Sequence, residues 1–328
     1  VKALLSVVGG VLGTLFFRTN MVKEESAHTL IEKLFANNLI DQNGKPNNRV
    51  ITPRYTMPVS QYPTNAEGES EAKDRFYGSI PCKDIARAKF GENFEDYLYV
   101  FNYVSTGNMI QTAKDLYDYI QFVKKDTGAK KVNLIPVSQG GSITNGLMKY
   151  YDEQNISLSR DINRIVFAVP ALDGAALLGD CYRYGFNKNS EALYTTAMPS
   201  VIGYENYLGY VINIAMRLMP KTDVDNLLDC IAETLINDHL RYSTLMWGLV
   251  PSGDYPACKE KYLSEAGLEE IARQTDWYYQ AQLDSEKYIL KAIEDGVKVF
   301  DIVDTNVELY QLAVSHDKQN CDGIIHVA

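Results

Sequence analysis

The segment KKVNLIPVSQGGSITNGLMKYY, residues 130–151, decides how we interpret the fold of this chain. It begins with a nearly continuous run of strand-forming apolar residues, which is typical of a strand buried on both faces. A serine and two glycines follow, and apolar residues then recur every four positions, as in an amphipathic helix. The sequence therefore predicts a strand over 132–137, a sharp turn at Ser138 and a helix over 139–151.

Strand and helix signals also alternate on both sides of this segment. An aromatic and β-branched run predicts a strand over 96–104, and the apolar spacing that follows predicts a helix over 108–124. Further along the chain, we expect a strand over 164–170, a helix over 284–295 and a strand over 297–303. This alternation predicts βαβ units, and hence an α/β fold: a mostly parallel sheet with helices on both faces.

The pattern changes between the last two predicted strands, where the signals become mostly helical. We expect residues 175–283 to form an inserted helical cap, and residues 1–174 with 284–328 to form the α/β core. The sequence does not assign residues 1–94 to particular elements of that core. A plain helical second domain is the alternative. The cap is favoured because loops at the carboxyl ends of parallel strands are where ligands bind.

Composition excludes some classes of protein. The 328 residues carry a net charge of −10, whereas a nucleic-acid-binding protein needs a basic face to neutralise phosphates. The five cysteines are widely scattered and form no CxxC pair, so no zinc ribbon or thioredoxin-type site is predicted. Neither a dinucleotide fingerprint nor a phosphate-binding loop occurs, and no cofactor is expected.

Both ends of the sequence look truncated. It begins at Val1, and residues 1–17 are almost wholly apolar. A buried helix, a shortened export or anchor segment, and a strand with a glycine turn all fit this stretch. The other end, CDGIIHVA, stops within a predicted strand. We therefore expect a fragment at both ends, and a secreted or membrane-anchored location is favoured over a cytoplasmic one.

The turn at Ser138 has the features of a displayed nucleophile. Pro136-Val137-Ser138-Gln139-Gly140 resembles the G-x-S-x-G nucleophile elbow of the α/β-hydrolases, with proline in the first glycine position. Such a serine has positive φ, and the residues two before and two after it must be small. The Gln139 N–H, at the helix start, would point toward a developing oxyanion. The alternative is a serine that merely caps the helix.

The resemblance extends over about residues 95–328 and is to the bacterial lipase and esterase branch of that superfamily. The helix and strand before the elbow are similar to that branch, as are VPALDGAALLGD (169–180), where many lipases begin their lid, and NCDGIIHVA (320–328). The resemblance implies a hydrolase with a serine nucleophile, a catalytic triad and a lid domain. It also implies the chain order serine, acid, histidine.

The resemblance offers three candidates for the acid. Asp322, in CDGII, matches an aspartate that supplies the acid in some bacterial lipases and binds calcium in related ones. Asp304 follows the strand over 297–303, the commonest acid position in the fold. Asp173 follows the strand over 164–170, and its alternative role is to shape a turn with Gly174.

The histidine is harder to assign. The sequence contains His28, His239, His316 and His326. The first two are expected to be surface or packing residues. His316 precedes Asp322, and His326 follows it too closely, so we expect the catalytic histidine to lie beyond Ala328. If Asp304 is the acid, His316 fits the order.

The sequence therefore predicts a serine carboxylester hydrolase that forms an acyl-enzyme on Ser138. The apolar cap, with Trp247, suggests a hydrophobic acyl chain and peripheral lipid contact, although most of these residues would also fit the core of the cap. The expected partner is a small-molecule or lipid ester. An acyltransferase, a phospholipase and a non-catalytic binding protein on the same fold are the alternatives.

Overall fold

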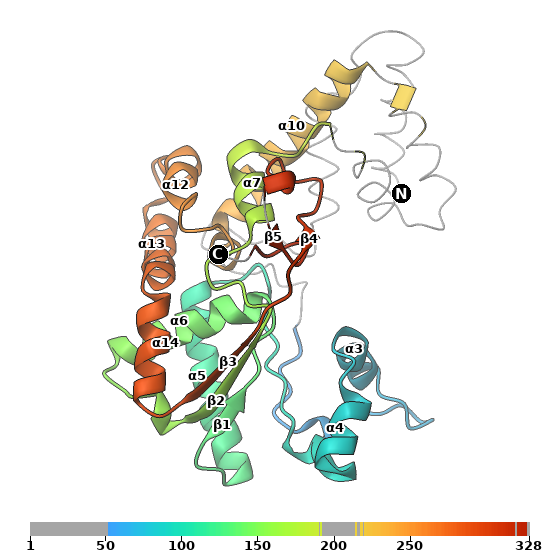
Figure 1. Cartoon of the computed structure of the whole chain (residues 1–328), viewed down its shortest axis with the longest axis vertical. Helices are drawn as coiled ribbons and strands as arrows, with labels where there is room; N and C mark the ends of the chain where they lie inside the picture. Colours follow the sequence, from blue (N-terminus) through green and yellow to red (C-terminus); the bar gives the residue numbers. More distant parts are fainter. Residues whose placement is uncertain are drawn as a thin grey trace.

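The computed structural model describes residues 52–189, 220–318 and 320–326, together with positions 191, 214, 217 and 218. The predicted apolar element at residues 1–17 lies outside the described residues, as does most of the segment 190–219. Within the described part, the chain is a mixed α/β protein built around a small parallel sheet (Figure 1).

The sheet contains the three predicted strands β1 (Val132–Leu134), β2 (Ile162–Ala168) and β3 (Lys298–Ile302), in the order β1-β2-β3. All of them run parallel, so the predicted parallel arrangement is confirmed. β1 is shorter than expected, and a single bridge between Val137 and Ala168 continues its pairing up to the elbow.

Helices cover only one face of this sheet in the described part of the chain. On that face, Ile165 of β2 lies fully buried in the main core. On the other face, Ile135, Phe300 and Ile302 are 66%, 51% and 57% exposed. The prediction of helices on both faces is therefore wrong for the described residues, as is that of a strand over 132–137 buried on both faces. Each right-handed crossover steps in the same direction along the sheet, and this places its helix on the same side.

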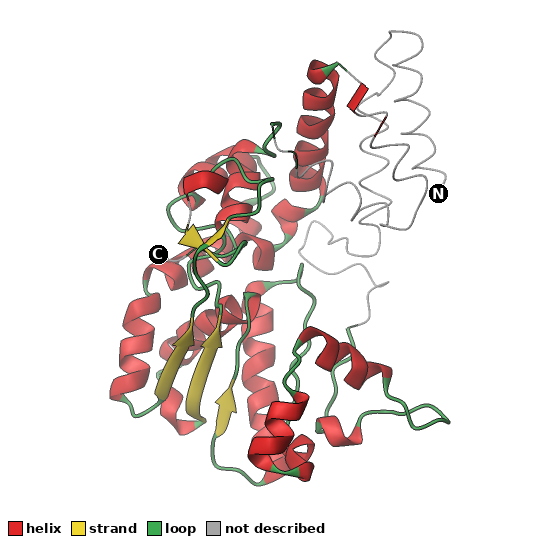
Figure 2. Ribbon diagram, turned by 45° about the vertical axis from the view of Figure 1, so that its right-hand side comes forward, coloured by secondary structure: helices red, strands yellow, loops and turns green. Residues whose placement is uncertain are grey.

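The covering layer contains α5 (Met109–Thr127), α6 (Gln139–Glu153), α13 (Glu269–Leu283) and α14 (Ser285–Glu294). These confirm the predicted helices over 108–124, 139–151 and 284–295. The Asn108 side chain accepts a hydrogen bond from the Gln111 N–H at the start of α5. Figure 2 shows the helices packed behind the sheet. Their shared core contains Met109, Leu116, Ile120, Ile143, Leu147, Tyr151, Tyr278 and Tyr288.

The predicted strand over 96–104 is not formed. Its first residues belong to a 3-10 helix, Glu92–Tyr97, and the rest is extended without a strand partner. Its backbone is held instead by single contacts: Leu98 O accepts from the Val59 N–H, and Val100 O accepts from the Tyr119 hydroxyl. Phe101 and Tyr103 still pack against the main core. The aromatic residues that predicted a strand therefore fill the core without joining the sheet.

The predicted cap region contains α7 (Ala176–Tyr184), α10 (Lys221–Asp238), α11 (Thr244–Trp247) and α12 (Tyr255–Leu263). Trp247 is 2% exposed and belongs to a second hydrophobic cluster of buried residues, so it is part of the core of this region. At the end of the region, α13 packs against α5 and α6. The division into core and cap stays a prediction.

The remaining elements lie near the two ends of the described chain. α3 (Glu71–Ser79) and α4 (Lys83–Phe90) have no buried side chains, and a loop over 63–70 precedes them. After β3, the short strands β4 (Val307–Glu308) and β5 (Asn320–Cys321) pair antiparallel. In the part of the chain that the structure describes, no helix is both long and apolar enough to span a membrane.

Candidate active site

Ser138 lies where β1 passes into α6, and its backbone is strained. Its φ is 52° and its ψ is −118°, which differs from both the helical and the strand conformations. A non-glycine residue with positive φ is uncommon, and in a structure it points to a constraint that the surroundings enforce. Ser138 is exposed to solvent. The predicted sharp turn from strand to helix is therefore confirmed.

The Ser138 hydroxyl does not cap the helix that follows it. Ser70, Asn108 and Ser243 each accept a hydrogen bond from the backbone of the helix that they precede, whereas the Ser138 side chain accepts none. The alternative interpretation, in which this serine serves as an ordinary helix cap, is therefore wrong. The hydroxyl is left available for another partner.

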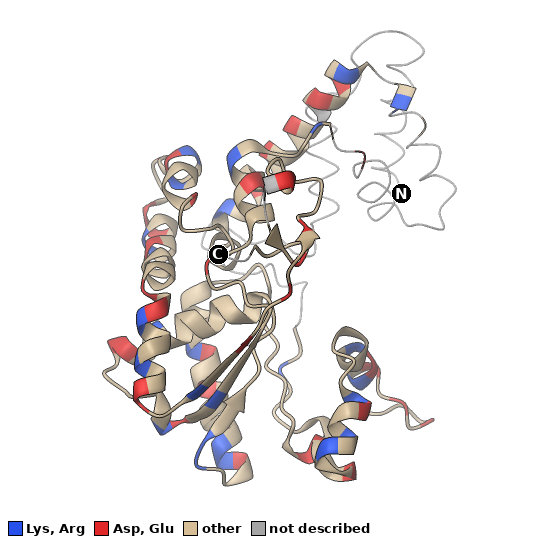
Figure 3. Ribbon diagram, viewed as in Figure 1, with Lys and Arg blue, Asp and Glu red and all other residues tan. Residues whose placement is uncertain are grey.

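The Gln139 N–H is suited to stabilise negative charge. Gln139 is the first residue of α6, and its N–H has no acceptor within the described part of the chain. The next two amides are occupied, because the Gly140 N–H donates to Val137 O and the Gly141 N–H donates to Ser138 O. The positive end of the helix dipole adds to the field there. Residues 132–148 carry no charged side chain, and the start of α6 is accordingly uncharged in Figure 3.

The turn after β2 holds the elbow on both sides of the serine. The Ser138 N–H donates to Ala168 O at 3.1 Å, and the Ala171 N–H donates to Ser138 O at 3.1 Å. A Cβ on Gly141 would lie 2.6 Å from the Pro170 Cβ, whereas one on Gly140 would lie 3.6 Å from the Pro136 Cβ, an ordinary contact. The glycine that sterics require is therefore Gly141. The second glycine of SQGG was the available sequence signal for it.

Two of the predicted acids lie beyond the carboxyl end of β3. The exposed Asp304 accepts a hydrogen bond from the Thr305 N–H. Asp322 follows β5, and its bridge to Val307 returns it close to the segment after Asp304. Ser138 leaves the same edge of the sheet two strands away, about 10 Å at the usual strand spacing. Asp304 thus lies two residues beyond the end of β3, and Asp322 pairs with the segment that follows it.

Asp173 instead fastens a turn. Its Oδ1 accepts a hydrogen bond from the Ser252 N–H at 2.9 Å. The next residue, Gly174, has a φ of 80°, and a Cβ there would lie 2.6 Å from Leu249 O. Asp173 thus joins the end of β2 to the segment around Ser252.

The surroundings of Asp322 were the candidate calcium site of the sequence analysis. The Asp322 Oδ1 already accepts from the Ile324 and Ile325 N–H groups. No cluster of three His, Cys, Asp or Glu side chains occurs within the described residues.

The described histidines are not joined to the elbow. His316 begins a 3-10 helix, His316–Lys318, and His326 bridges Cys321. The Nδ1 atoms of both are enclosed and make no hydrogen bond within the described residues, to an aspartate or to Ser138. His239 is buried at the end of α10, and His28 lies outside the described residues. Among the described residues, the elbow therefore presents Ser138 and the Gln139 N–H without an assembled serine–histidine–acid relay.

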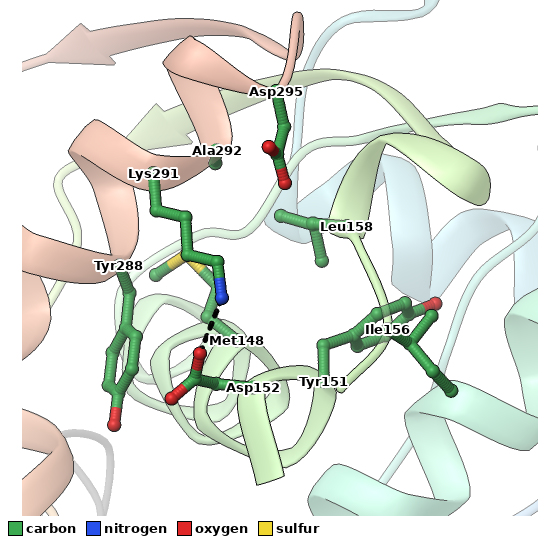
Figure 4. Close-up of a pocket in the computed structure, with 9 residues that line it drawn as sticks. All are labelled: Met148, Tyr151, Asp152, Ile156, Leu158, Tyr288, Lys291, Ala292 and Asp295. Carbon is green, nitrogen blue, oxygen red and sulfur yellow. Dashed lines mark hydrogen bonds and ion pairs between the residues drawn. The ribbon is translucent and has the colours of Figure 1, made fainter. Parts of the chain in front are cut away.

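A small pocket lies at the opposite end of α6. The 15 residues of α6 span about 20 Å, and the pocket adjoins its last turns. An ion pair of 2.6 Å between Lys291 and Asp152 crosses it (Figure 4). The lining residues are Met148, Tyr151, Asp152, Ile156, Leu158, Tyr288, Lys291, Ala292 and Asp295. This pocket is therefore separate from the elbow.

Comparison with known proteins leaves the site to be interpreted from its own geometry. No protein-family model, curated protein or solved structure matches the chain.

Proposed function

We propose that this chain is a serine carboxylester hydrolase of the α/β-hydrolase type, and that Ser138 carries the acyl group. One observation carries the proposal: a serine with positive φ lies exposed at a strand-to-helix turn, and its hydroxyl caps nothing. Backbone strain of this kind persists where the surroundings enforce it, and it clusters at active sites. The parallel order β1-β2-β3, with the turn at the carboxyl end of β1, supports the same fold.

The mechanism proceeds in two halves. A base removes the proton of the Ser138 hydroxyl as its Oγ attacks the ester carbonyl, and the alkoxide leaving group takes up that proton. Water then attacks the acyl-enzyme in the same way and releases the acid. The Gln139 N–H donates to the oxyanion in both halves. One such donor is worth about 3 kcal/mol in the transition state.

The base and the acid come from the chain segments that follow β3. Asp304 or Asp322 would orient the base: Asp304 follows β3, which runs parallel to the strand before Ser138, and Asp322 pairs with the segment after Asp304. Among the described histidines, His316 and His326 lie in this part of the chain, and each has an Nδ1 that is not hydrogen-bonded to another described residue.

The substrate class follows from the uncharged surroundings of the elbow. The ten residues from Gln139 to Met148 and the turn over 168–171 contain no ionisable side chain. Val137, next to the serine, is 37% exposed. An ester with an apolar acyl group, from a small molecule or a lipid, suits such a surface better than an anionic acyl group.

The test compares Ser138→Ala with Ser264→Ala, which removes an exposed hydroxyl at the end of α12. Hydrolysis of p-nitrophenyl esters with acyl chains of two to twelve carbons should fall by about 10⁴-fold or more in the first variant and stay unchanged in the second. A fluorophosphonate probe should label the peptide that contains Ser138. Turnover that survives Ser138→Ala would overturn the proposal.

Two further measurements resolve the open roles. His316→Ala and His326→Ala, assayed separately, identify the base if one variant loses turnover while binding of the ester is retained; turnover retained in both would mean that neither histidine is the base. Addition of an alcohol to the assay separates hydrolysis from acyl transfer, since a transferase yields the new ester in place of the free acid. Binding of an ester without any turnover would indicate the non-catalytic alternative.

A further inference from the structure

A second strained residue, Val169, lies directly after β2. Its φ is 43°, although it is β-branched, and a β-branched side chain is a clear outlier in the positive-φ region. It directly follows β2, and its N–H donates to Ile302 O on β3 at 2.8 Å. The chain therefore reverses at Val169 while it remains tied to the neighbouring strand.

Because of this reversal, one short segment forms hydrogen bonds to both the N–H and the carbonyl group of Ser138. Ala168, before Val169, accepts the hydrogen bond from the Ser138 N–H. Ala171, two residues after Val169, donates its N–H to Ser138 O. Both peptide groups of Ser138 are thus fixed by partners only three residues apart. The positive φ of Val169 lies between these two partners and sets the path of the chain from one to the other.

The start of α6, the helix that follows Ser138, anchors the segment Val169–Ala171. The Ser142 hydroxyl, fully buried in α6, donates to Ala171 O at 2.6 Å. Pro170 packs against Gly141 at a distance that admits only glycine there. The contacts are therefore reciprocal. The segment Val169–Ala171 holds the backbone of Ser138, and Ser142 in the first turn of α6 holds that segment.

We propose that the turn Val169–Ala171 and the Ser142 hydroxyl form a positioning clamp that imposes the strained backbone of Ser138. The clamp rests on the proposed function, because its purpose is to aim the Ser138 Oγ at the substrate. Val169 and Ser142 touch no reacting atom, so they are positioning residues. The strain at Val169 is then a second cost that the fold bears in order to hold the nucleophile.

The test uses four variants of the full chain. Val169→Gly keeps the positive φ, because glycine adopts it freely, whereas Val169→Pro forbids it. Ser142→Ala removes the anchor and leaves the backbone chemistry intact. Thr144→Val is the matched control, since it also removes a buried hydroxyl from α6, but one that donates to the helix's own Gly140 O.

Two readouts separate the clamp from the activity. The first is hydrogen exchange at the Ser138 and Ala171 amides, which should rise at least about tenfold in Ser142→Ala and Val169→Pro, and stay within about twofold in the other two. The second is ester turnover, where kcat should fall at least about tenfold in the same two variants with KM unchanged. Val169→Gly should retain turnover, which a purely space-filling valine would not allow.

Each outcome decides one of the two proposals. Unchanged exchange at both amides in Ser142→Ala would overturn the clamp, whatever the activity, and this variant is decisive even if Val169→Pro does not fold. Raised exchange with unchanged kcat would also overturn it, because the serine would then not need the clamp. Raised exchange in a chain whose parent never reacts at Ser138 would leave the clamp as a backbone device and refute the proposed hydrolase.

Discussion

Gly141 lies against Pro170 with no room for a side chain between them. A Cβ on Gly141 would lie 2.6 Å from the Pro170 Cβ and 2.9 Å from its Cα, closer than real Cβ contacts occur. The contact joins the first turn of α6 to the turn that follows β2. It is therefore the steric condition under which the backbone around Ser138 can take its strained form.

Gly141→Ala should destabilise the protein by about 2 kcal/mol, because the added methyl group meets backbone and must push the turn away. Gly140→Ala is the matched control. A Cβ at this position would make only an ordinary contact of 3.6 Å with the Pro136 Cβ, and Gly140 has no positive φ. Alanine also favours a helix over glycine by about 1 kcal/mol, so this variant should be neutral or stabilised. Urea unfolding of both variants checks the difference, and equal losses would contradict it.

The three candidate acids should separate by their effect on catalysis. We expect one of Asp304→Asn and Asp322→Asn to lower kcat by about 10³-fold or more, since an amide cannot hold the base in the correct tautomer and charge. Asp173→Asn should leave kcat unchanged, because its Oδ1 still accepts from the Ser252 N–H. Steady-state kinetics on the three variants gives the answer. A large loss in Asp173→Asn alone would place the acid after β2.

Asp161 should make the stability of the chain sensitive to acid. It is fully buried, which by itself raises the pKa of a carboxyl group, but hydrogen bonds from Arg160, Lys124, Tyr151 and Gln121 outweigh burial and hold its pKa well below the usual range. Because the folded pKa is depressed, the stabilisation is present above the unfolded pKa of about 3.9. It is lost as the pH falls from there toward the folded pKa.

Asp161→Asn should therefore lower the free energy of unfolding by about 3 kcal/mol at pH 7, since it leaves the charges of Lys124 and Arg160 without their partner. The difference in the free energy of unfolding between wild type and variant should become smaller as the pH falls below about 4. Urea unfolding at several pH values between 3 and 7 measures it. Asp126→Asn, which removes a carboxylate on the exposed side of α5, is the control with little expected effect. A difference in the free energy of unfolding that stays constant across this pH range would refute the depressed pKa of Asp161.

The parts of the fold that the sequence predicted are those with local signals. Asn108 caps α5 and Gly128 ends it with a φ of 69°, and both are visible as residue types at the right spacing. Ser138 was likewise predictable, because strand, serine, glycine and helix follow one another directly. The segment over 98–104 was not, since Phe101 and Tyr103 are strand formers whose pairing depends on a neighbour elsewhere in the chain.

The unpredicted parts of the site depend on contacts between distant residues. Pro170 requires Gly141 to be glycine across 29 positions of sequence, and no pattern near either residue reveals it. The positive φ of Val169 contradicts the preference of valine, so propensity argues against it. The choice between Asp304 and Asp322 depends on how the chain after β3 returns to the sheet edge. Sequence order alone left this choice open.

The thiols provide a last prediction, which tests the packing of the cap region. Burial raises the pKa of Cys181 and of Cys258 to about 12, and both side chains lie in the cluster around Trp247. A thiol reacts as its thiolate, so neither should react at pH 8 in the folded protein. Cys82 and Cys230 are only half-buried and should react first.

Titration with Ellman's reagent should therefore show two fast thiols in the native chain and all five in denaturant. The double variant Cys82→Ser/Cys230→Ser is the control and should show no fast phase, because the remaining Cys321 is also buried and donates its S–H to Val307 O. Fast modification of Cys181 or Cys258 in that variant would mean that α7 and α12 separate readily in solution. The cluster around Trp247 would then open on the time scale of the titration, and the cap region could not be a packed unit.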